Sequence, residues 1–177
     1  PLGTDEEFVT VLEVDEPGFY ILDRDWFVPP EPSQVGQAVL MISASNVVID
    51  MRGHLLEALG GSVYYEKLVS IELGANNVTL RNGRLHNRGA DDETRDVFSQ
   101  GNYLRLEAME FNGREVELFG DNVSIERSAF RNVGAVSVNA LQVRGTAYTI
   151  RENTFFGQGF VSLRGSDHQI VGNTMYC

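Results

Sequence analysis

The chain has 177 residues, of which 42% are hydrophobic and 22% are charged, so it can fold around one substantial core. Its 25 Asp and Glu residues outnumber the 14 Lys and Arg residues, which gives a formal net charge of −11. This charge argues against a nucleic-acid partner, because phosphate binding requires a basic surface. No apolar run approaches the ~20 residues that cross a bilayer, so no membrane insertion is expected. The single cysteine, Cys177, excludes an internal disulfide.

The beginning of the chain differs in kind from the rest. Residues 1–7 are expected to form a tail. Residues 8–14 alternate apolar and polar positions like an edge strand, and residues 17–25 are typical of a turn followed by a second strand. We expect residues 8–35 to be an N-terminal β cap with a proline-rich connection, which covers the apolar end of the repeats that follow. The alternative is a ligand-binding role for Trp26 in this segment.

A repeat governs the chain from residue 36 to residue 177. Its anchors are six aliphatic residues spaced 19 to 31 positions apart, namely Ile49, Leu80, Leu106, Ile125, Ile150 and Ile170. Most anchors have apolar residues two, seven and nine positions before them and five positions after them. This alternation predicts short strands with one buried face. Units of this length cannot bury their apolar face alone, so they are expected to stack.

The repeat also predicts the corners and the direction of single side chains. Glycine, which tolerates tight corners, stands five positions before four of the anchors, at Gly101, Gly120, Gly145 and Gly165. By the same offsets Leu73 is expected to face inward, and His54 and His168 replace apolar residues at inward positions. No two histidines share an offset, so a metal ladder is not expected.

Five segments carry the strand, corner and strand pattern most clearly, and they are residues 46–53, 77–83, 122–128, 150–155 and 170–175. In these segments the chain resembles the right-handed parallel β-helix repeats of the pectate-lyase-like superfamily. The resemblance implies an all-β fold, a right-handed parallel β-helix of about six coils. It also implies a secreted, periplasmic or cell-surface location. The superfamily contains lyases, epimerases, hydrolases, adhesins and non-catalytic scaffolds, so the fold by itself assigns no function.

The last unit of the repeat ends without a polar terminal unit. We therefore expect the β-helix over residues 36–177 to be truncated at its C-terminal end, or to be covered there by another copy or another chain. A structural or adhesive scaffold that associates through this last coil is one function consistent with the pattern.

The connections after the strands vary in length. Residues 55–70, 86–96 and 131–140 form long connections, whereas residues 112–115 and 156–160 form short ones. In a stacked solenoid, insertions at one offset emerge on one side, and this side is commonly the binding side. We expect a polysaccharide or a cell-surface glycan to bind along this long-loop face, and we prefer this function to the scaffold.

Catalysis on a carboxyl-bearing sugar is a second alternative. Proton abstraction beside the carboxyl group needs a base and a cation that stabilises the developing negative charge. In a polysaccharide lyase or epimerase His86, Tyr65 or Lys67 would be the base. Arg88 or Arg95 would be the electrophile.

Acidic residues in the same stretch suggest a cation. Asp91, Asp92 and Asp96 could supply oxygen ligands to Ca²⁺, which takes 6–8 of them, although their spacing matches no EF-hand loop. The alternative is a solvated acidic loop, and no other cofactor is expected.

A second polar surface is predicted on the outer face of the strands. The position after each anchor is mostly charged, with Asp50, Arg81, Glu107, Glu126 and Arg151. In a parallel stack these side chains form a ladder of mixed sign, which is either a solvated face with ion pairs or a shallow sugar-binding platform.

Overall fold

The computed structural model describes residues 12–29, 38–59, 66–88, 94–131, 139–157 and 160–176. Every regular element in these residues is a β-strand. Among the described residues, no helix has the length and apolar character needed to cross a membrane.

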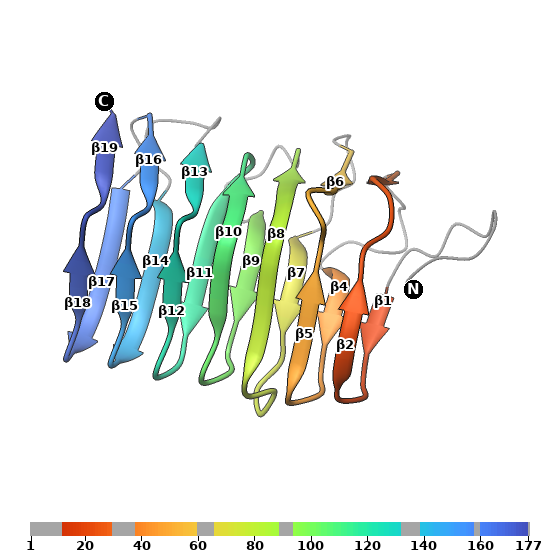
Figure 1. Ribbon diagram of the computed structural model, residues 1–177, viewed down its shortest axis with the longest axis horizontal. Helices are drawn as coiled ribbons and strands as arrows, with labels where there is room; N and C mark the ends of the chain where they lie inside the picture. Colours follow the sequence, from red (N-terminus) through yellow and green to blue (C-terminus); the bar gives the residue numbers. More distant parts are fainter. Residues whose placement is uncertain are drawn as a thin grey trace.

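Two sheets of strands pack against each other across an apolar core (Figure 1). The seven-stranded sheet consists of β1 (Leu12–Val14), β4 (Ala38–Ile42), β7 (Lys67–Ile71), β9 (Arg95–Ser99), β11 (Glu115–Phe119), β14 (Asn139–Thr146) and β17 (Phe160–Ser166). The twelve-stranded sheet consists of β2 (Gly18–Ile21), β3 (Trp26–Val28), β5 (Val47–Asp50), β6 (Leu55–Ala58), β8 (Val78–Asn87), β10 (Arg105–Phe111), β12 (Ser124–Glu126), β13 (Ala129–Arg131), β15 (Thr149–Arg151), β16 (Thr154–Phe156), β18 (Gln169–Val171) and β19 (Thr174–Tyr176).

The register of the strands confirms the repeat. Neighbouring strands pair in parallel, and the pairing aligns the anchors in one row, Ile49, Leu80, Leu106, Ile125, Ile150 and Ile170. Each turn of the chain adds one strand to the seven-stranded sheet and then crosses to the twelve-stranded sheet (Figure 1). The fold is therefore a β-solenoid of stacked parallel strands, as the sequence predicts.

The N-terminal segment belongs to the same stack. Leu12 pairs with Leu40 in the seven-stranded sheet, and Trp26 pairs with Leu56 in the other sheet, both in parallel. The described part of the segment 8–35, which was expected to be a β cap, thus takes the form of a further turn stacked on the repeats. Six strands of the seven-stranded sheet lie within residues 36–177, in agreement with the six anchors, and β1 adds a seventh turn before them. Trp26 packs against the core.

One inward assignment was wrong because a corner contains extra residues. Ile71, not Leu73, pairs with Ile42, so the chain gains two residues between β7 and β8. Leu73 lies in this turn and is 80% exposed. The strands on both sides of the corner still pair in parallel with the strands of the preceding turn, so only the length of the corner differs from the predicted repeat.

Only one of the two histidines that were expected to point inward does so. His54 lies in a corner, where its Nδ1 is 3.2 Å from Asp25 Oδ1, and Leu56 takes the inward position beside Leu85. His168 stacks its ring on Tyr148 with the ring centres 4.5 Å apart. The prediction that the side chain points inward is therefore wrong for His54 and confirmed for His168.

The corners after the anchors are held by buried side-chain amides. Asn153 is 1% exposed, donates from Nδ2 to the carbonyl of Ile125 at 2.9 Å and accepts the amide N–H of Ser128 at 2.8 Å. One turn later, Asn173 donates to the carbonyl of Ile150 at 2.7 Å and accepts the N–H of Asn153. These bonds satisfy main-chain groups that point into the core at the bend.

Candidate functional site

Two of the residues expected to act in catalysis meet around a buried glutamate. His86 lies on β8 beside Glu57 of β6, with its Nδ1 3.7 Å from Glu57 Oε1. Arg88 forms an ion pair with the same carboxylate, whose side chain is 4% exposed. Burial lowers the pKa of His86, Arg88 lowers it further, and Glu57 raises it in part. His86 is therefore a neutral base at neutral pH. We call these three residues the His86 cluster.

Lys67 and Arg95 lie on the other sheet. They are paired neighbours on β7 and β9, and both approach the ring of Phe98, with Lys67 Nζ 4.7 Å and Arg95 Cζ 5.8 Å from the ring centre. Arg95 Nε donates to Glu117 Oε2 at 2.5 Å. The structure thus separates four of the five expected catalytic residues into two groups of two, and the fifth, Tyr65, lies outside the described residues.

An aromatic and charged surface surrounds Lys67 and Arg95 on the outer side of the seven-stranded sheet. Phe98 and Phe119 contact edge to face at 5.8 Å, and Arg144 lies 5.0 Å from the Phe119 ring. Gln142 Nε2 donates to Glu117 Oε1 at 2.5 Å. We call this surface the cation–aromatic face, and it comprises Lys67, Arg95, Phe98, Glu117, Phe119, Gln142 and Arg144.

In the ranges that the structure describes, two buried polar atoms at this face lack a hydrogen-bond partner. Among the described residues, Arg144 Nε and Glu115 Oε1 are buried without a hydrogen-bond partner. Burial raises the pKa of Glu115, and the neighbouring Glu117 carboxylate raises it further. Phe98, Phe119 and Glu117 were not predicted from the sequence as site residues. The signal for Phe98 was present, since alternation with the buried Val97 places it on the outer face.

Asp96 faces the inside of the corner between the two sheets. Its Oδ1 accepts the N–H of Asn87 at 2.9 Å, and its Oδ2 accepts the N–H of Gly113 at 3.0 Å. Burial raises the pKa of this carboxyl to about 7. Asp91 and Asp92 lie outside the described residues, and within the described part no three His, Cys, Asp or Glu side chains are arranged to hold a metal ion. Calcium binding by these aspartates stays a prediction.

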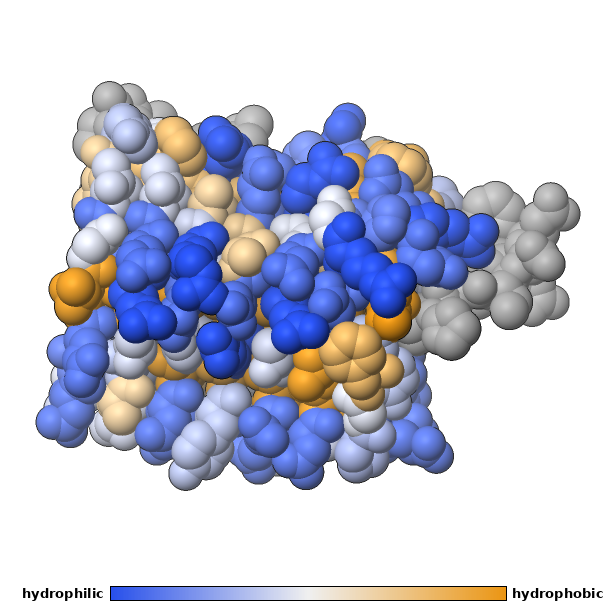
Figure 2. All heavy atoms as spheres, viewed as in Figure 1, coloured by the Kyte–Doolittle hydropathy of each residue, from blue (hydrophilic) through white to orange (hydrophobic). Residues whose placement is uncertain are grey.

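The charged ladder forms on the outer side of the twelve-stranded sheet. Arg81 Nη2 lies 2.9 Å from Asp50 Oδ2, and Glu126 accepts hydrogen bonds at 2.9 Å from both Ser124 Oγ and Arg151 Nη2. Figure 2 shows mostly hydrophilic residues across this face, with apolar residues between them. The ion pairs confirm the mixed-sign ladder that the spacing predicts.

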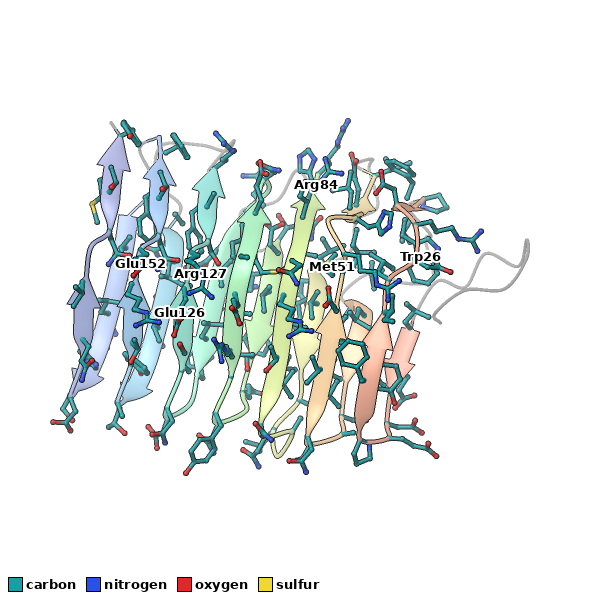
Figure 3. All side chains as sticks on the ribbon, in the orientation of Figure 1. Trp26, Met51, Arg84, Glu126, Arg127 and Glu152 are labelled. Atoms are coloured by element: carbon teal, nitrogen blue, oxygen red, sulfur yellow. The ribbon has the colours of Figure 1, made fainter. Side chains whose placement is uncertain are left out.

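An open groove lies beside this ladder, where the strands of the twelve-stranded sheet bend. It has a volume of about 370 Å³, with Gly53, Ala108 and Ala129 among the small residues that line it. Arg84, Glu110 and Arg127 also line it, and Figure 3 shows Arg84 and Arg127 on either side of β10. We call it the bend groove. The groove was not predicted from the sequence, because its small residues come from different turns and only Gly53 and Ala129 share an offset from their anchors.

The fold and these surfaces define a parallel β-solenoid with polar outer faces. No family model, no curated protein and no solved structure matches the chain. Its function is therefore inferred from its own surfaces.

Proposed function

We propose that the chain is a carbohydrate-binding β-solenoid module, related to the pectate-lyase-like proteins and working outside the cell or in the cell envelope. In this proposal a polysaccharide or cell-surface glycan lies along the cation–aromatic face. The observation that carries the proposal is the pair of outward aromatic rings, Phe98 and Phe119, set among fixed charged and amide groups. Lys67 and Arg95, which were expected within the long connections 55–70 and 86–96 and which lie on β7 and β9, contribute two of these groups.

The chemistry of the face suits a sugar polymer. Aromatic rings offer large apolar contact area to the C–H faces of sugar rings, and a few placed polar groups orient the hydroxyl groups. Glu117 and Gln142 are buried, with 6% and 8% of their surface exposed, and the hydrogen bond from Arg95 to Glu117 holds the Arg95 side chain in place before any ligand arrives, which reduces the entropy lost on binding. The seven parallel strands extend over about 30 Å, a length that admits several sugar units.

Aromatic substitutions test this proposal. The intact chain is screened on a glycan array, with and without Ca²⁺, and the affinity for the best polymer is measured by calorimetry. Phe98→Ala and Phe119→Ala should each weaken binding about tenfold, because an aromatic contact contributes on the order of 1 kcal/mol or more. The matched control is Phe19→Ala, since Phe19 is 57% exposed and lies 5.6 Å from Arg81, but on the other sheet.

The control variant should bind like the unaltered chain. Failure of every polysaccharide to bind, or an equal loss in Phe19→Ala, would contradict the proposal. The first outcome would favour the scaffold function.

Polysaccharide lyase or epimerase activity is the second candidate, and the His86 cluster favours it. A neutral His86 could accept a proton, and Glu57 holds Arg88 beside it. Lys67 and Arg95 then serve binding on the other sheet. Incubation with polyuronates should give unsaturated products or changed uronate stereochemistry that disappears in His86→Ala and Arg88→Ala. Turnover that survives both substitutions would exclude this cluster as the catalytic site.

A further inference from the structure

We infer that the bend groove is a second binding site, and that it takes a neutral sugar unit of an oligosaccharide. The groove lies on the twelve-stranded sheet, whereas the cation–aromatic face lies on the other sheet. The inference therefore goes beyond the proposed function and does not depend on it.

The shape of the groove comes from small residues among large neighbours. Ala129 pairs with Glu110 in one neighbouring turn and with Thr154 in the other, so its methyl group lies between two longer side chains. Ala108 occupies a bend position that Arg127 fills one turn later. The resulting volume of about 370 Å³ falls within the ~300–1,000 Å³ of small-molecule sites.

The bend recurs from turn to turn along the stack, and the alanine at position 108 distinguishes this hollow. Asn82, Ala108 and Arg127 follow their anchors by two positions and have φ values of 56°, 52° and 51°. This left-handed conformation favours Gly, Asn and Asp over alanine. An asparagine at position 108 would suit the backbone better, as Asn82 does one turn earlier, but its longer side chain would narrow the groove.

The charges around the groove are paired, and Arg84 Nη2 lies 3.8 Å from Asp25 Oδ1. Arg127 forms ion pairs with Glu107 and, at 3.4 Å, with Glu126. Glu110 Oε1 lies 2.9 Å from Arg131 Nε. The pairs hold these side chains in place while leaving them partly exposed, so they can still donate to and accept from a ligand.

This charge balance selects a neutral ligand. A sugar hydroxyl can accept a hydrogen bond from Arg127 and donate one to Glu110 without breaking either ion pair. The methyl groups of Ala108 and Ala129 can contact the C–H face of the ring. A carboxylate on the ligand would instead compete with Glu107 and Glu126 for Arg127 and would meet Glu110 as a like charge.

Amide chemical-shift titration of the intact chain tests the site. The probes are cellotriose, maltotriose, mannotriose and xylotriose, with trigalacturonate as the charged comparison. At least one neutral trisaccharide should cause saturable shifts at the amides of Gly53, Ala108 and Ala129, and trigalacturonate should not. Ala129→Phe fills the groove and should weaken this binding at least about tenfold. The matched control is Thr154→Phe, the same substitution one turn further along the same row.

Several outcomes would overturn the inference. These are the absence of saturable shifts with all four neutral probes, tighter binding of trigalacturonate, or equal losses in Ala129→Phe and Thr154→Phe. If Ala129→Phe does not give a native spectrum, Ala129→Met replaces it with the same expected direction. Phe98→Ala separates the two proposals, since it should leave binding in the groove unchanged, and a loss there would assign the sugar to the cation–aromatic face.

Discussion

The environment of Asp96 shows how one residue joins three parts of the solenoid. Its carboxylate receives main-chain N–H groups from Asn87 at the end of β8 and from Gly113 between β10 and β11. Gly113 has no room for a side chain, because a Cβ there would lie 2.4 Å from Asp96 Oδ1. The main-chain N–H groups of Asn87 and Gly113 therefore hold the Asp96 carboxyl group in one position at this corner.

This carboxyl group should make stability depend on pH. Its pKa is raised to about 7 in the folded chain, above the ordinary value of 3.8, because burial disfavours the charged form. A raised folded-state pKa stabilises the fold at low pH, and this stability is lost as pH rises from about 4 to 7. We expect Asp96 to lower the free energy of unfolding by about 2 kcal/mol between pH 5 and pH 8.

Urea unfolding of the intact chain and of Asp96→Asn at both pH values measures this contribution. The variant should be less stable at pH 5, because its side-chain amide would turn an N–H donor toward main-chain N–H groups. Its free energy of unfolding should also change less between pH 5 and pH 8, because the Asp96 carboxyl is gone. Identical pH dependence in the two proteins would contradict the assignment. His86 and the other titrating groups are present in both, so they cancel in the difference.

At the scale of elements, the aromatic ladder in the core links neighbouring turns. Phe130 stacks between Phe111 at 4.8 Å and Phe155 at 4.7 Å and is 1% exposed. Phe130→Ala should lower the free energy of unfolding by about 4 kcal/mol, because it removes buried area and leaves a cavity. Phe130→Leu should cost less, about 1–2 kcal/mol. The control, Phe19→Ala, removes an exposed ring and should change stability by less than about 0.5 kcal/mol in the same denaturant titration. Similar losses in Phe130→Ala and Phe19→Ala would contradict this account of the core.

Strands could be predicted from the sequence far better than corners. The inward row of anchors was correct because a single shift in register would move a whole strand's apolar side chains to the surface. Leu73 and His54 were misplaced because a corner can absorb two residues without disturbing the strands on either side. The first turn was not predicted as part of the repeat, because its inward positions differ from those of the other turns. Gly18 and Tyr20 stand at its inward positions, where most of the other turns have aliphatic residues.

The candidate sites, too, could be predicted only where they depend on residues close together in the sequence. Lys67 and Arg95 were expected within the long connections 55–70 and 86–96, and the structure places them instead as paired neighbours on β7 and β9. Their separation from His86 and Arg88 could not be predicted, since it depends on which sheet each strand joins. The bend groove depends on which residues of neighbouring turns lie side by side, as Glu110 and Ala129 do. Such pairings require the register of the whole stack.

At the scale of the whole molecule, the described strands pair in parallel with strands of the neighbouring turns. Each strand bonds to the strands of the adjacent turns, so stability is expected to vary along the stack rather than to be shared by all turns. Strands β10 and β11 lie in its middle and bury most of their side chains, whereas every residue of β18 and β19 is exposed in this chain.

Hydrogen exchange of the intact chain, followed by mass spectrometry, should reveal this gradient. We expect the slowest exchange in β9, β10 and β11, whose amides lie between two bonded neighbours, and the fastest in β18 and β19. The first turn provides the comparison at the opposite end. Val14, Leu22 and Val28 are buried there, so β1 and β3 should exchange more slowly than β18 and β19 although they too lie at an end of the described stack. Equal protection in all turns would show instead that the chain unfolds as one cooperative unit, and that exposure at the last turn does not weaken its hydrogen bonds.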